Sequence, residues 1–121
     1  MEKQPMNRRQ TGTAYEELAA RRLSDQGYEI LERNFYCRQG EIDLIARDGG
    51  YLVFIEVKYR RDLQSGHPLE AVGTYKQRRI ARAAVYYCHS HGISDSQACR
   101  FDVISILGNE IEHVKNAFEL I

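Results

Sequence analysis

Apolar residues near the N-terminus recur at helical spacing. Ala14, Leu18, Ala19 and Leu23 fall on one face of a helix, and polar residues separate them. Gly27 follows and is a residue type that commonly ends a helix. We therefore predict a first helix over Gly12–Gln26, preceded at residues 1–11 by a polar, disordered N-terminal arm.

Three segments with the character of β-strands come next. Tyr28–Tyr36 contains β-prone residues, Glu41–Arg47 alternates charged with apolar residues, and one face of Tyr51–Tyr59 is almost wholly apolar. Asp48-Gly49-Gly50, between the last two segments, is typical of a tight turn. The second and third strands are therefore predicted to form a hairpin.

The rest of the chain predicts one more helix, continuous or broken, and two more strands. The helix spans Leu69–His91 after a polar loop, and the strands span Cys99–Leu107 and Glu110–Val114. The order α-β-β-β-α-β, with a final β, predicts an α/β fold with a mixed central sheet flanked by helices, in a single domain over 12–121. If the third and fourth strands are adjacent, the helix between them makes them parallel, with a right-handed crossover.

Composition narrows the classes of protein that fit. The 17 basic and 17 acidic residues give no net charge, so any contact with nucleic acid must be local. Such an excess exists over residues 58–82, with seven basic and two acidic residues. No apolar run approaches the roughly 20 residues of a membrane span, and the N-terminus lacks a secretory pattern. Three cysteines without CxxC spacing fit a reducing compartment, so we expect a cytoplasmic protein with no membrane association.

Two short motifs bring acids and a lysine to the predicted hairpin. Gly40-Glu41-Ile42-Asp43 lies on one strand and Phe54-Ile55-Glu56-Val57-Lys58 on the next. Two carboxylates can hold a hard cation through oxygen, and Lys58 shares a face with Glu56 because side chains alternate along a strand. The alternative is a solvent-exposed strand face without a functional site, because Glu-x-Lys is common on such strands.

The register of the hairpin decides how closely these side chains meet. A turn centred on Gly49-Gly50 places Asp43 directly opposite Glu56, whereas one centred on Asp48-Gly49 places Glu41 there. In both registers the three acids and the lysine share one face, and a three-residue loop without a bulge would reverse that parity. Directly opposed carboxylates repel, unless a divalent cation binds them or one keeps a proton with a raised pKa.

In combination, these segments resemble a known family. Gly-Glu-Ile-Asp-Leu-Ile, Val-Phe-Ile-Glu-Val-Lys, Lys-Gln-Arg-Arg and Arg-Phe-Asp-Val-Ile are similar to motifs of the YraN-like family, small bacterial proteins regarded as predicted endonucleases. The likeness runs from about Gly12 to Leu107. That family is similar to archaeal Holliday-junction resolvases of the PD-(D/E)XK nuclease superfamily, whose core has the order α-β-β-β-α-β. The usual proline before the first acid is replaced here by Ile42, which removes no ligand.

The resemblance implies roles for the acids and the lysine. Asp43 and Glu56 would be ligands of Mg²⁺, for which Mn²⁺ could substitute, with the backbone carbonyl of Val57 as a third ligand. Lys58 would position the attacking water and stabilise charge on the phosphate. Glu16 would complete the metal shell directly or through water; the alternative is an ordinary exposed helix acid.

Two further acids are expected to have supporting roles rather than to bind the metal directly or catalyse. Glu41 would support the metal ligands or pair with an arginine. Asp102, in Arg100-Phe-Asp-Val, is expected to anchor the fold through a charged hydrogen bond rather than to catalyse.

Basic residues of the second predicted helix suggest a DNA-binding surface. Lys76 lies one turn before Ile80 of the apolar stripe, so we expect it to face the strand ends and contact phosphate. Gln77 would support the phosphate contact more weakly, or its side chain would turn to solvent. The remaining candidates for contact with the DNA backbone are Arg60, Arg78, Arg79 and Arg82, the last three on an exposed flank. No aromatic–basic alternation indicates base stacking, so recognition of shape or backbone is expected.

One hypothesis and two rivals follow. The main hypothesis is a Mg²⁺-dependent, structure-selective endonuclease that hydrolyses phosphodiester bonds in branched or junction DNA. The resemblance to resolvases implies a homodimer, because two strands must be cut symmetrically. The rivals are a non-catalytic nucleic-acid-binding accessory domain in repair, recombination or DNA uptake, and a protein-interaction domain whose charged strand face is only solvated.

Overall fold

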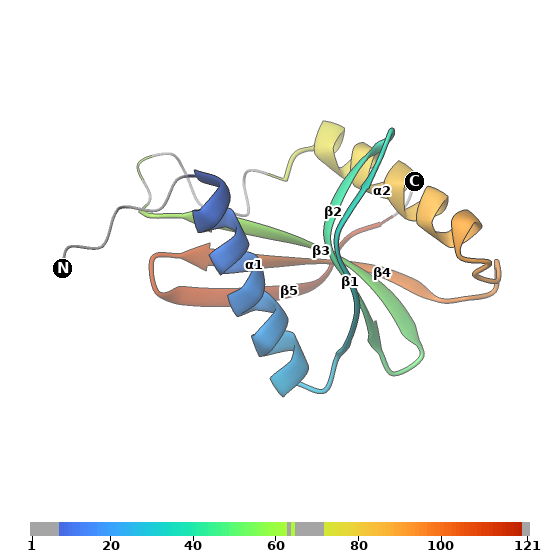
Figure 1. Cartoon of the computed structure of the whole chain (residues 1–121), viewed down its shortest axis with the longest axis horizontal. Helices are drawn as coiled ribbons and strands as arrows, with labels where there is room; N and C mark the ends of the chain where they lie inside the picture. Colours follow the sequence, from blue (N-terminus) through green and yellow to red (C-terminus); the bar gives the residue numbers. More distant parts are fainter. Residues whose placement is uncertain (1–7, 63, 65–71, 120–121) are drawn as a thin grey trace.

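The computed structural model describes residues 8–62, 64 and 72–119, with side chains from residue 14 onward. Within them, α-helices and β-strands follow in the predicted order (Figure 1). Their bounds are α1 Arg8–Asp25, β1 Glu29–Cys37, β2 Gly40–Asp48, β3 Tyr51–Arg60, α2 Thr74–Ser90, β4 Cys99–Leu107 and β5 Glu110–Phe118.

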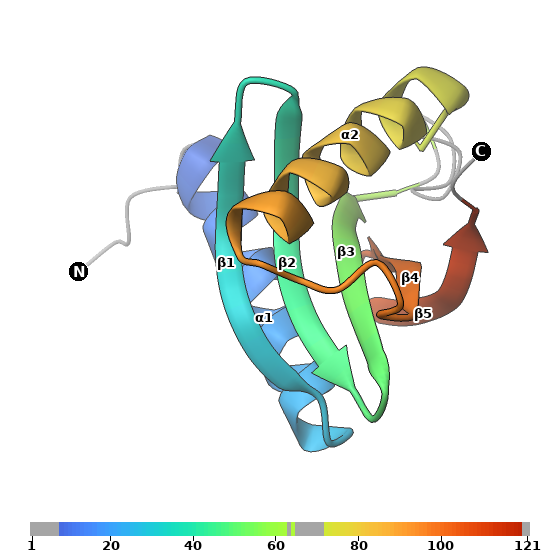
Figure 2. The same cartoon turned by 90° about the vertical axis from the view of Figure 1, so that its right-hand side faces the viewer.

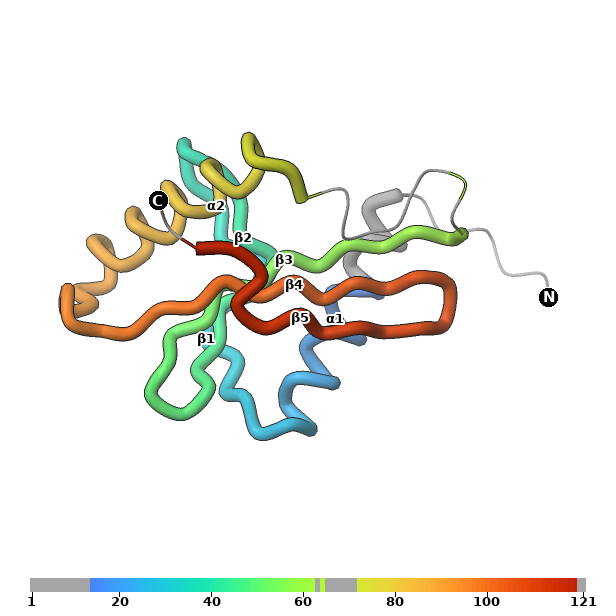
Figure 3. Tube along the Cα trace, turned by 180° about the vertical axis from the view of Figure 1, so that it is seen from behind, coloured from blue at the N-terminus to red at the C-terminus, as the bar shows by residue number. Residues whose placement is uncertain are grey.

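The strands form one mixed sheet in sequence order, β1 to β5. Neighbouring strands are antiparallel except for β3 and β4, which are parallel and are connected through α2. A parallel pair requires a long crossover, which the α2 segment supplies. Figure 3 shows the β4–β5 hairpin beside β3. The predicted mixed sheet flanked by helices is thus confirmed, as is the parallel pairing of the third and fourth strands.

The two helices cover opposite faces of this sheet (Figure 2). α1 packs Ala19, Ala20 and Leu23 against one face, where β2, β3 and β4 contribute small and branched residues. α2 packs Ile80, Ala83, Ala84 and Tyr87 against the other face, over an aromatic-rich set from β1 to β4. Because β2 and β3 are covered on both faces, a charged residue in their interior needs a specific partner.

Both helices begin at positions other than those predicted. α1 begins at Arg8, so residues 8–11 of the predicted arm are helical, and residues 1–7 lie outside the described part. α2 begins at Thr74 rather than Leu69, after an extended Gly73; residues 69–71 also lie outside the described part. Of the helices in the described ranges, none is long and apolar enough to cross a membrane.

A buried charged cluster explains why β5 extends past its predicted end at Val114. Asp102 of β4 is 1% exposed and accepts hydrogen bonds from Arg100 Nε at 2.8 Å, His113 Nε2 at 2.7 Å and the backbone N–H of Asn116 at 3.0 Å. Burial raises the pKa of Asp102, but the hydrogen bonds from His113 and Arg100 outweigh it and hold that pKa below its ordinary value. The tail of β5 is therefore tied to β4 by tertiary contacts that local sequence does not reveal.

Candidate metal and phosphate site

The β2–β3 hairpin adopts the register centred on Gly49-Gly50. The paired positions run from Asp48–Tyr51 to Leu44–Ile55. One position further on, Oδ2 of Asp43 accepts a hydrogen bond from the backbone N–H of Val57 at 2.8 Å. The side chain of the first predicted acid thus lies against the backbone of the strand that contains the second.

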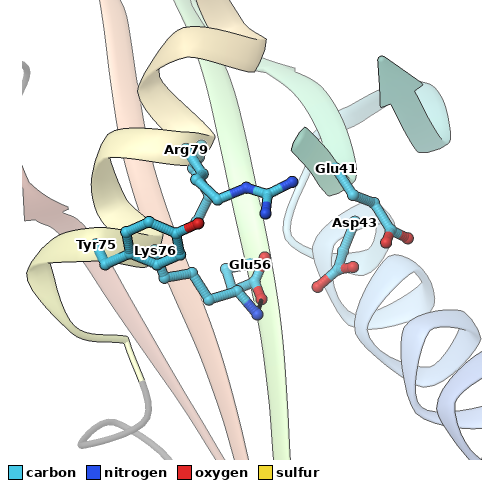
Figure 4. A pocket seen from close by; sticks show the side chains of 7 residues that line it. Glu41, Asp43, Glu56, Tyr75, Lys76 and Arg79 are labelled. Carbon is cyan, nitrogen blue, oxygen red and sulfur yellow. Dashed lines mark ion pairs between the residues drawn. The ribbon is translucent and has the colours of Figure 1, made fainter. Parts of the chain in front are cut away.

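Glu56, in β3, is 4% exposed and is balanced by two lysines. Its Oε1 lies 3.2 Å from Nζ of Lys58 and 2.6 Å from Nζ of Lys76. Lys58 is two residues along the same strand, whereas Lys76 reaches in from the first turn of α2 (Figure 4). A buried carboxylate without such partners would be costly, so the two ammonium groups stabilise it in this position.

Gly40 allows α2 to lie close to the acids. A Cβ at this position would be 3.2 Å from the backbone oxygen of Arg79 and 3.5 Å from its Cβ. Any side chain there would press on the helix backbone, which only glycine avoids. The glycine of the first motif therefore helps to place the first two turns of α2 over β2.

The acids and the start of α2 enclose a cavity of about 320 Å³ (Figure 4). It is lined by Glu41, Asp43, Glu56, Tyr75, Lys76, Arg79 and Ile80. Arg79 is exposed, as expected for a flank residue, but its guanidinium also points toward Glu41 and Asp43. The cavity thus combines acids on the sheet with cations on the helix.

A second opening of about 320 Å³ reaches the same acids from the side of α1. It is lined by Tyr15, Glu16, Glu41, Asp43, Glu56, Val57, Lys58, Tyr59, Arg60 and Lys76. Glu16 of α1 therefore lies beside the acids of β2 and β3, and is not an isolated exposed acid. Next to it, the ring of Tyr15 stacks on Tyr59 with centroids 3.7 Å apart, which holds this turn of α1 against β3.

The electrostatics of Asp43 are strongly perturbed. Burial raises the pKa of Asp43 to about 8, with further contributions from the negative charges of Glu56 and Glu16, against the opposing effect of the Val57 hydrogen bond. Desolvation and like charges both disfavour the ionised form, which explains the direction. Without a cation, burial and the neighbouring negative charges therefore favour the protonated form of Asp43.

Glu16 is affected in the same direction. Burial raises the pKa of Glu16, a hydrogen bond from Asn34 lowers it, and the charges of Glu41 and Glu56 raise it again. Asn34 lies in β1 with φ of 53°, a left-handed conformation that asparagine tolerates better than most residues. Asn34 is thus a neighbour of the site that no sequence pattern marked.

The two lysines respond differently to the site. Burial and the neighbouring Lys76 lower the pKa of Lys58, and the attraction of Glu56 only partly opposes them. Burial also acts to lower the pKa of Lys76, but the attraction of Glu56 outweighs it, so the pKa of Lys76 is raised. Lys58 is the lysine that more readily gives up its proton.

The donor chemistry fits a hard divalent cation. Asp43 and Glu56 offer carboxylate oxygens, and the Val57 carbonyl points to the β2 side, because the N–H and C=O of one strand residue share a direction. The raised pKa of Asp43 is the electrostatic penalty that a cation would remove. Across the described ranges, no three His, Cys, Asp or Glu side chains already stand in position to hold an ion together. Oε1 of Glu56 is not free to join such a group, because both lysines contact it.

Other predicted residues lie apart from the two acids. Gln77 donates from Nε2 to the backbone oxygen of Val72 at 3.0 Å, so it supports the start of α2 and lines neither opening. Asp102 belongs to the cluster at the β4–β5 hairpin. Arg78 and Arg82 line a separate groove along α2.

Among the residues that line or adjoin the site, sequence reasoning did not identify Tyr15, Asn34, Tyr59 and Tyr75. Tyr75 precedes Lys76 and is 74% exposed over the cavity, and its only sequence signal was that position. Tyr15 and Asn34 meet the site through α1 and β1, whose packing no local pattern encodes.

Fold and site together define an α/β protein with a cavity over the centre of a mixed sheet. Acids line this cavity, and lysines balance their negative charge. The chain belongs to the uncharacterised protein family UPF0102, whose model matches residues 15–106. UPF0102 proteins of Lachnoclostridium phytofermentans and Pelobacter propionicus are each 51% identical, over 114 and 119 residues. The first alignment covers 94% of this chain and 97% of the relative, and the second covers 93% and 84%. A UPF0102 protein of Chromohalobacter salexigens is 45% identical over 115 residues, 92% of each chain.

Proposed function

We propose that this protein is a metal-dependent endonuclease that hydrolyses phosphodiester bonds in DNA. The observation that supports the proposal best is the convergence of Asp43, Glu56, Lys58 and Lys76 on one solvent-accessible cavity. Oxygen donors for a hard cation beside ammonium groups for a phosphate form a set of groups suited to phosphodiester hydrolysis at a metal site. A merely solvated strand face would not bury Glu56 to 4% exposure or perturb Asp43 so far.

The acids would hold the ion. Asp43 and Glu56 would be its ligands, with the Val57 carbonyl and Glu16 as further donors on the side of α1. A bound Mg²⁺ would supply Lewis acidity toward the phosphoryl oxygens. Glu41, which lines both openings, would contribute negative potential from the exposed end of β2.

The lysines would act on the substrate. Lys58, with its lowered pKa and partial burial, would orient a water for in-line attack. Lys76, with its raised pKa, remains a cation and would contact a phosphate oxygen at the mouth of the cavity. Arg79 would add a second positive charge from the next turn of α2.

The choice of substrate rests on resemblance rather than on the cavity. The motifs similar to those of junction resolvases favour branched DNA, and symmetrical cutting of two strands favours a homodimer. Both openings reach the acids from solvent, which is compatible with a backbone entering from the side of either helix.

Cleavage assays would test the proposal directly. Linear, flapped, single-stranded and four-way-junction DNA would be incubated with Mg²⁺, Mn²⁺ or EDTA. We expect cleavage that requires the metal and falls by about 100-fold or more in Glu56→Gln and Lys58→Met, the size typical of losing a group that stabilises the transition state. Glu29→Gln, at the far end of β1, is the charge-matched control and should cleave normally.

Two outcomes would reject the proposal. If no substrate is cleaved while DNA still binds, the accessory DNA-binding domain becomes the better explanation. If the protein neither cleaves nor binds DNA, the charged cavity serves an interaction with another protein.

A further inference from the structure

A groove of about 630 Å³ runs along the outer flank of α2, outside the cavity that contains the acids. It is lined by Gln39, Arg78, Ala81, Arg82, Val85, Tyr86 and His89. None of these lining residues is acidic, and α2 as a whole contains neither Asp nor Glu. The groove is therefore a locally positive surface on a chain with no net charge.

Helix geometry connects this groove with the cavity. Residues three or four apart are neighbours on a helix surface. Tyr75, Arg79, Arg82, Tyr86 and His89 follow one another at these spacings. Tyr75 and Arg79 line the cavity, whereas Arg82, Tyr86 and His89 line the groove. One stripe of α2 thus leads from the acids into the groove.

Aromatic rings and cations lie next to one another along this stripe. The pattern appears only on the helix surface, because these residues do not alternate regularly along the sequence. Tyr75 is 74% exposed and Tyr86 is 48% exposed, so both rings offer a face or edge to solvent. Tyr86 is held by Phe35 of β1, with centroids 6.3 Å apart, so its ring is supported from one side. Supported aromatic rings beside arginines are the elements on which single-stranded nucleic acids bind.

We propose that this groove binds a single-stranded segment of DNA adjoining the scissile phosphate. Arg78 and Arg82 contact its phosphates, and Tyr86 stacks on a base. In a duplex, both faces of each base are covered by neighbouring bases, so only the arginines contribute to its binding. An unpaired base can also stack on Tyr86, so the arginines and the ring both contribute to binding of a single strand. The groove volume lies within the about 300–1,000 Å³ of typical ligand sites, which suits a nucleotide rather than a duplex.

This proposal rests on the proposed function, because it assigns a substrate class to the same site. It favours DNA with an unpaired arm, such as a flap or tail, over continuous duplex. A second copy of the chain is the other candidate occupant, but a symmetric contact through this groove would bring the like-charged arginines of both copies together.

Fluorescence anisotropy in EDTA would test the groove without any cleavage. The probes are a labelled single-stranded oligonucleotide, a blunt duplex and a duplex with a single-stranded tail. Tyr86→Ala should weaken binding of the single strand and the tailed duplex by about fivefold or more, from about 1–3 kcal/mol per stacked base. Blunt-duplex binding should remain unchanged, and Tyr86→Phe should restore full affinity.

Arg82→Ala should weaken binding of all three probes and reduce the dependence of affinity on salt, because it removes one phosphate contact. Tyr51→Ala, with 47% exposure at the far end of β3, and Arg22→Ala on α1 are matched controls. Thermal unfolding would check that each variant remains folded.

The proposal is overturned if Tyr86→Ala leaves single-strand affinity unchanged, or weakens duplex and single strand equally. It is also overturned if the variant's main effect is a change of oligomeric state by light scattering, which would assign the groove to a second copy. Binding with these dependences but no cleavage of any substrate would reject the nuclease while leaving the groove in place.

Discussion

Replacing Asp43 by asparagine isolates the electrostatic penalty at the centre of the site. Asparagine has nearly the same shape, and its carbonyl can still accept the hydrogen bond from Val57 that the carboxylate accepts at 2.8 Å. Asparagine cannot ionise. Burial and the charge of Glu56, which raise the pKa of Asp43 to about 8, therefore impose no ionisation penalty on the variant. The variant therefore differs from the native protein mainly in proton linkage.

The sign and size of the effect follow from the pKa shift. Because the pKa of Asp43 rises from 3.8 to about 8 on folding, the folded state holds a proton that the unfolded state has lost. Native stability should therefore fall as the pH rises between these values. From pH 5 to pH 8 the linkage spans about three units, or about 4 kcal/mol at most, at about 1.4 kcal/mol per unit. Sharing of the proton with neighbouring acids reduces it, so we expect about 2–4 kcal/mol.

Urea unfolding of both proteins in EDTA at pH 5 and pH 8 measures this quantity. Asp43→Asn should gain about 2–4 kcal/mol relative to the native protein between the two pH values, and groups that titrate alike in both proteins cancel. Added Mg²⁺ at pH 8 should stabilise the native protein and have much less effect on the variant. A constant difference between the proteins from pH 5 to pH 8, or direct NMR titration of Asp43 near pH 4, would refute the reasoning.

Two further substitutions test the scaffold. Asp102→Asn should destabilise the protein at pH 7 by about 3–5 kcal/mol, because it removes the buried negative charge that accepts hydrogen bonds from Arg100 and His113. Since the folded pKa of Asp102 is lowered, this loss should shrink as the pH falls through the native pKa; a loss of the same size at pH 3, measured by urea unfolding, would contradict this role. Gly40→Val should cost about 1–3 kcal/mol, because its side chain meets the Arg79 backbone where a Cβ alone would lie 3.2 Å from the oxygen. Denaturant unfolding measures that loss, and equal stability would show that α2 moves aside freely.

The hairpin illustrates how far the sequence could lead. Alternation of charged and apolar residues predicted that Asp43 and Glu56 share a face, and Asp48-Gly49-Gly50 left two registers open. The structure selects the one in which Asp48 pairs with Tyr51. Parity could be predicted because the side-chain period of a strand is two, whereas the choice between registers depends on turn geometry.

The helix illustrates what the sequence could not give. Helical spacing predicted that Lys76 turns toward the strand ends, but it could not show that its Nζ pairs with Glu56. That contact depends on where α2 begins and on the close approach at Gly40, both set by tertiary structure. The same holds for β5, whose extension to Phe118 depends on the buried Asp102.

The position of β3 within the sheet has a consequence for adaptability. β3 is hydrogen-bonded to a strand on each side and covered by a helix on each face, so Glu56 and Lys58 lie on an element that cannot move without the whole fold. α2, by contrast, is an outer layer that rests on one face of the sheet and presents its flank to solvent. The acids and Lys58 thus belong to the inner strands of the sheet, whereas the surface proposed to bind DNA belongs to an outer helix that reaches Glu56 through Lys76. A substrate that displaced α2 would also change the Lys76–Glu56 ion pair, so binding along the helix and the charge around the acids are linked.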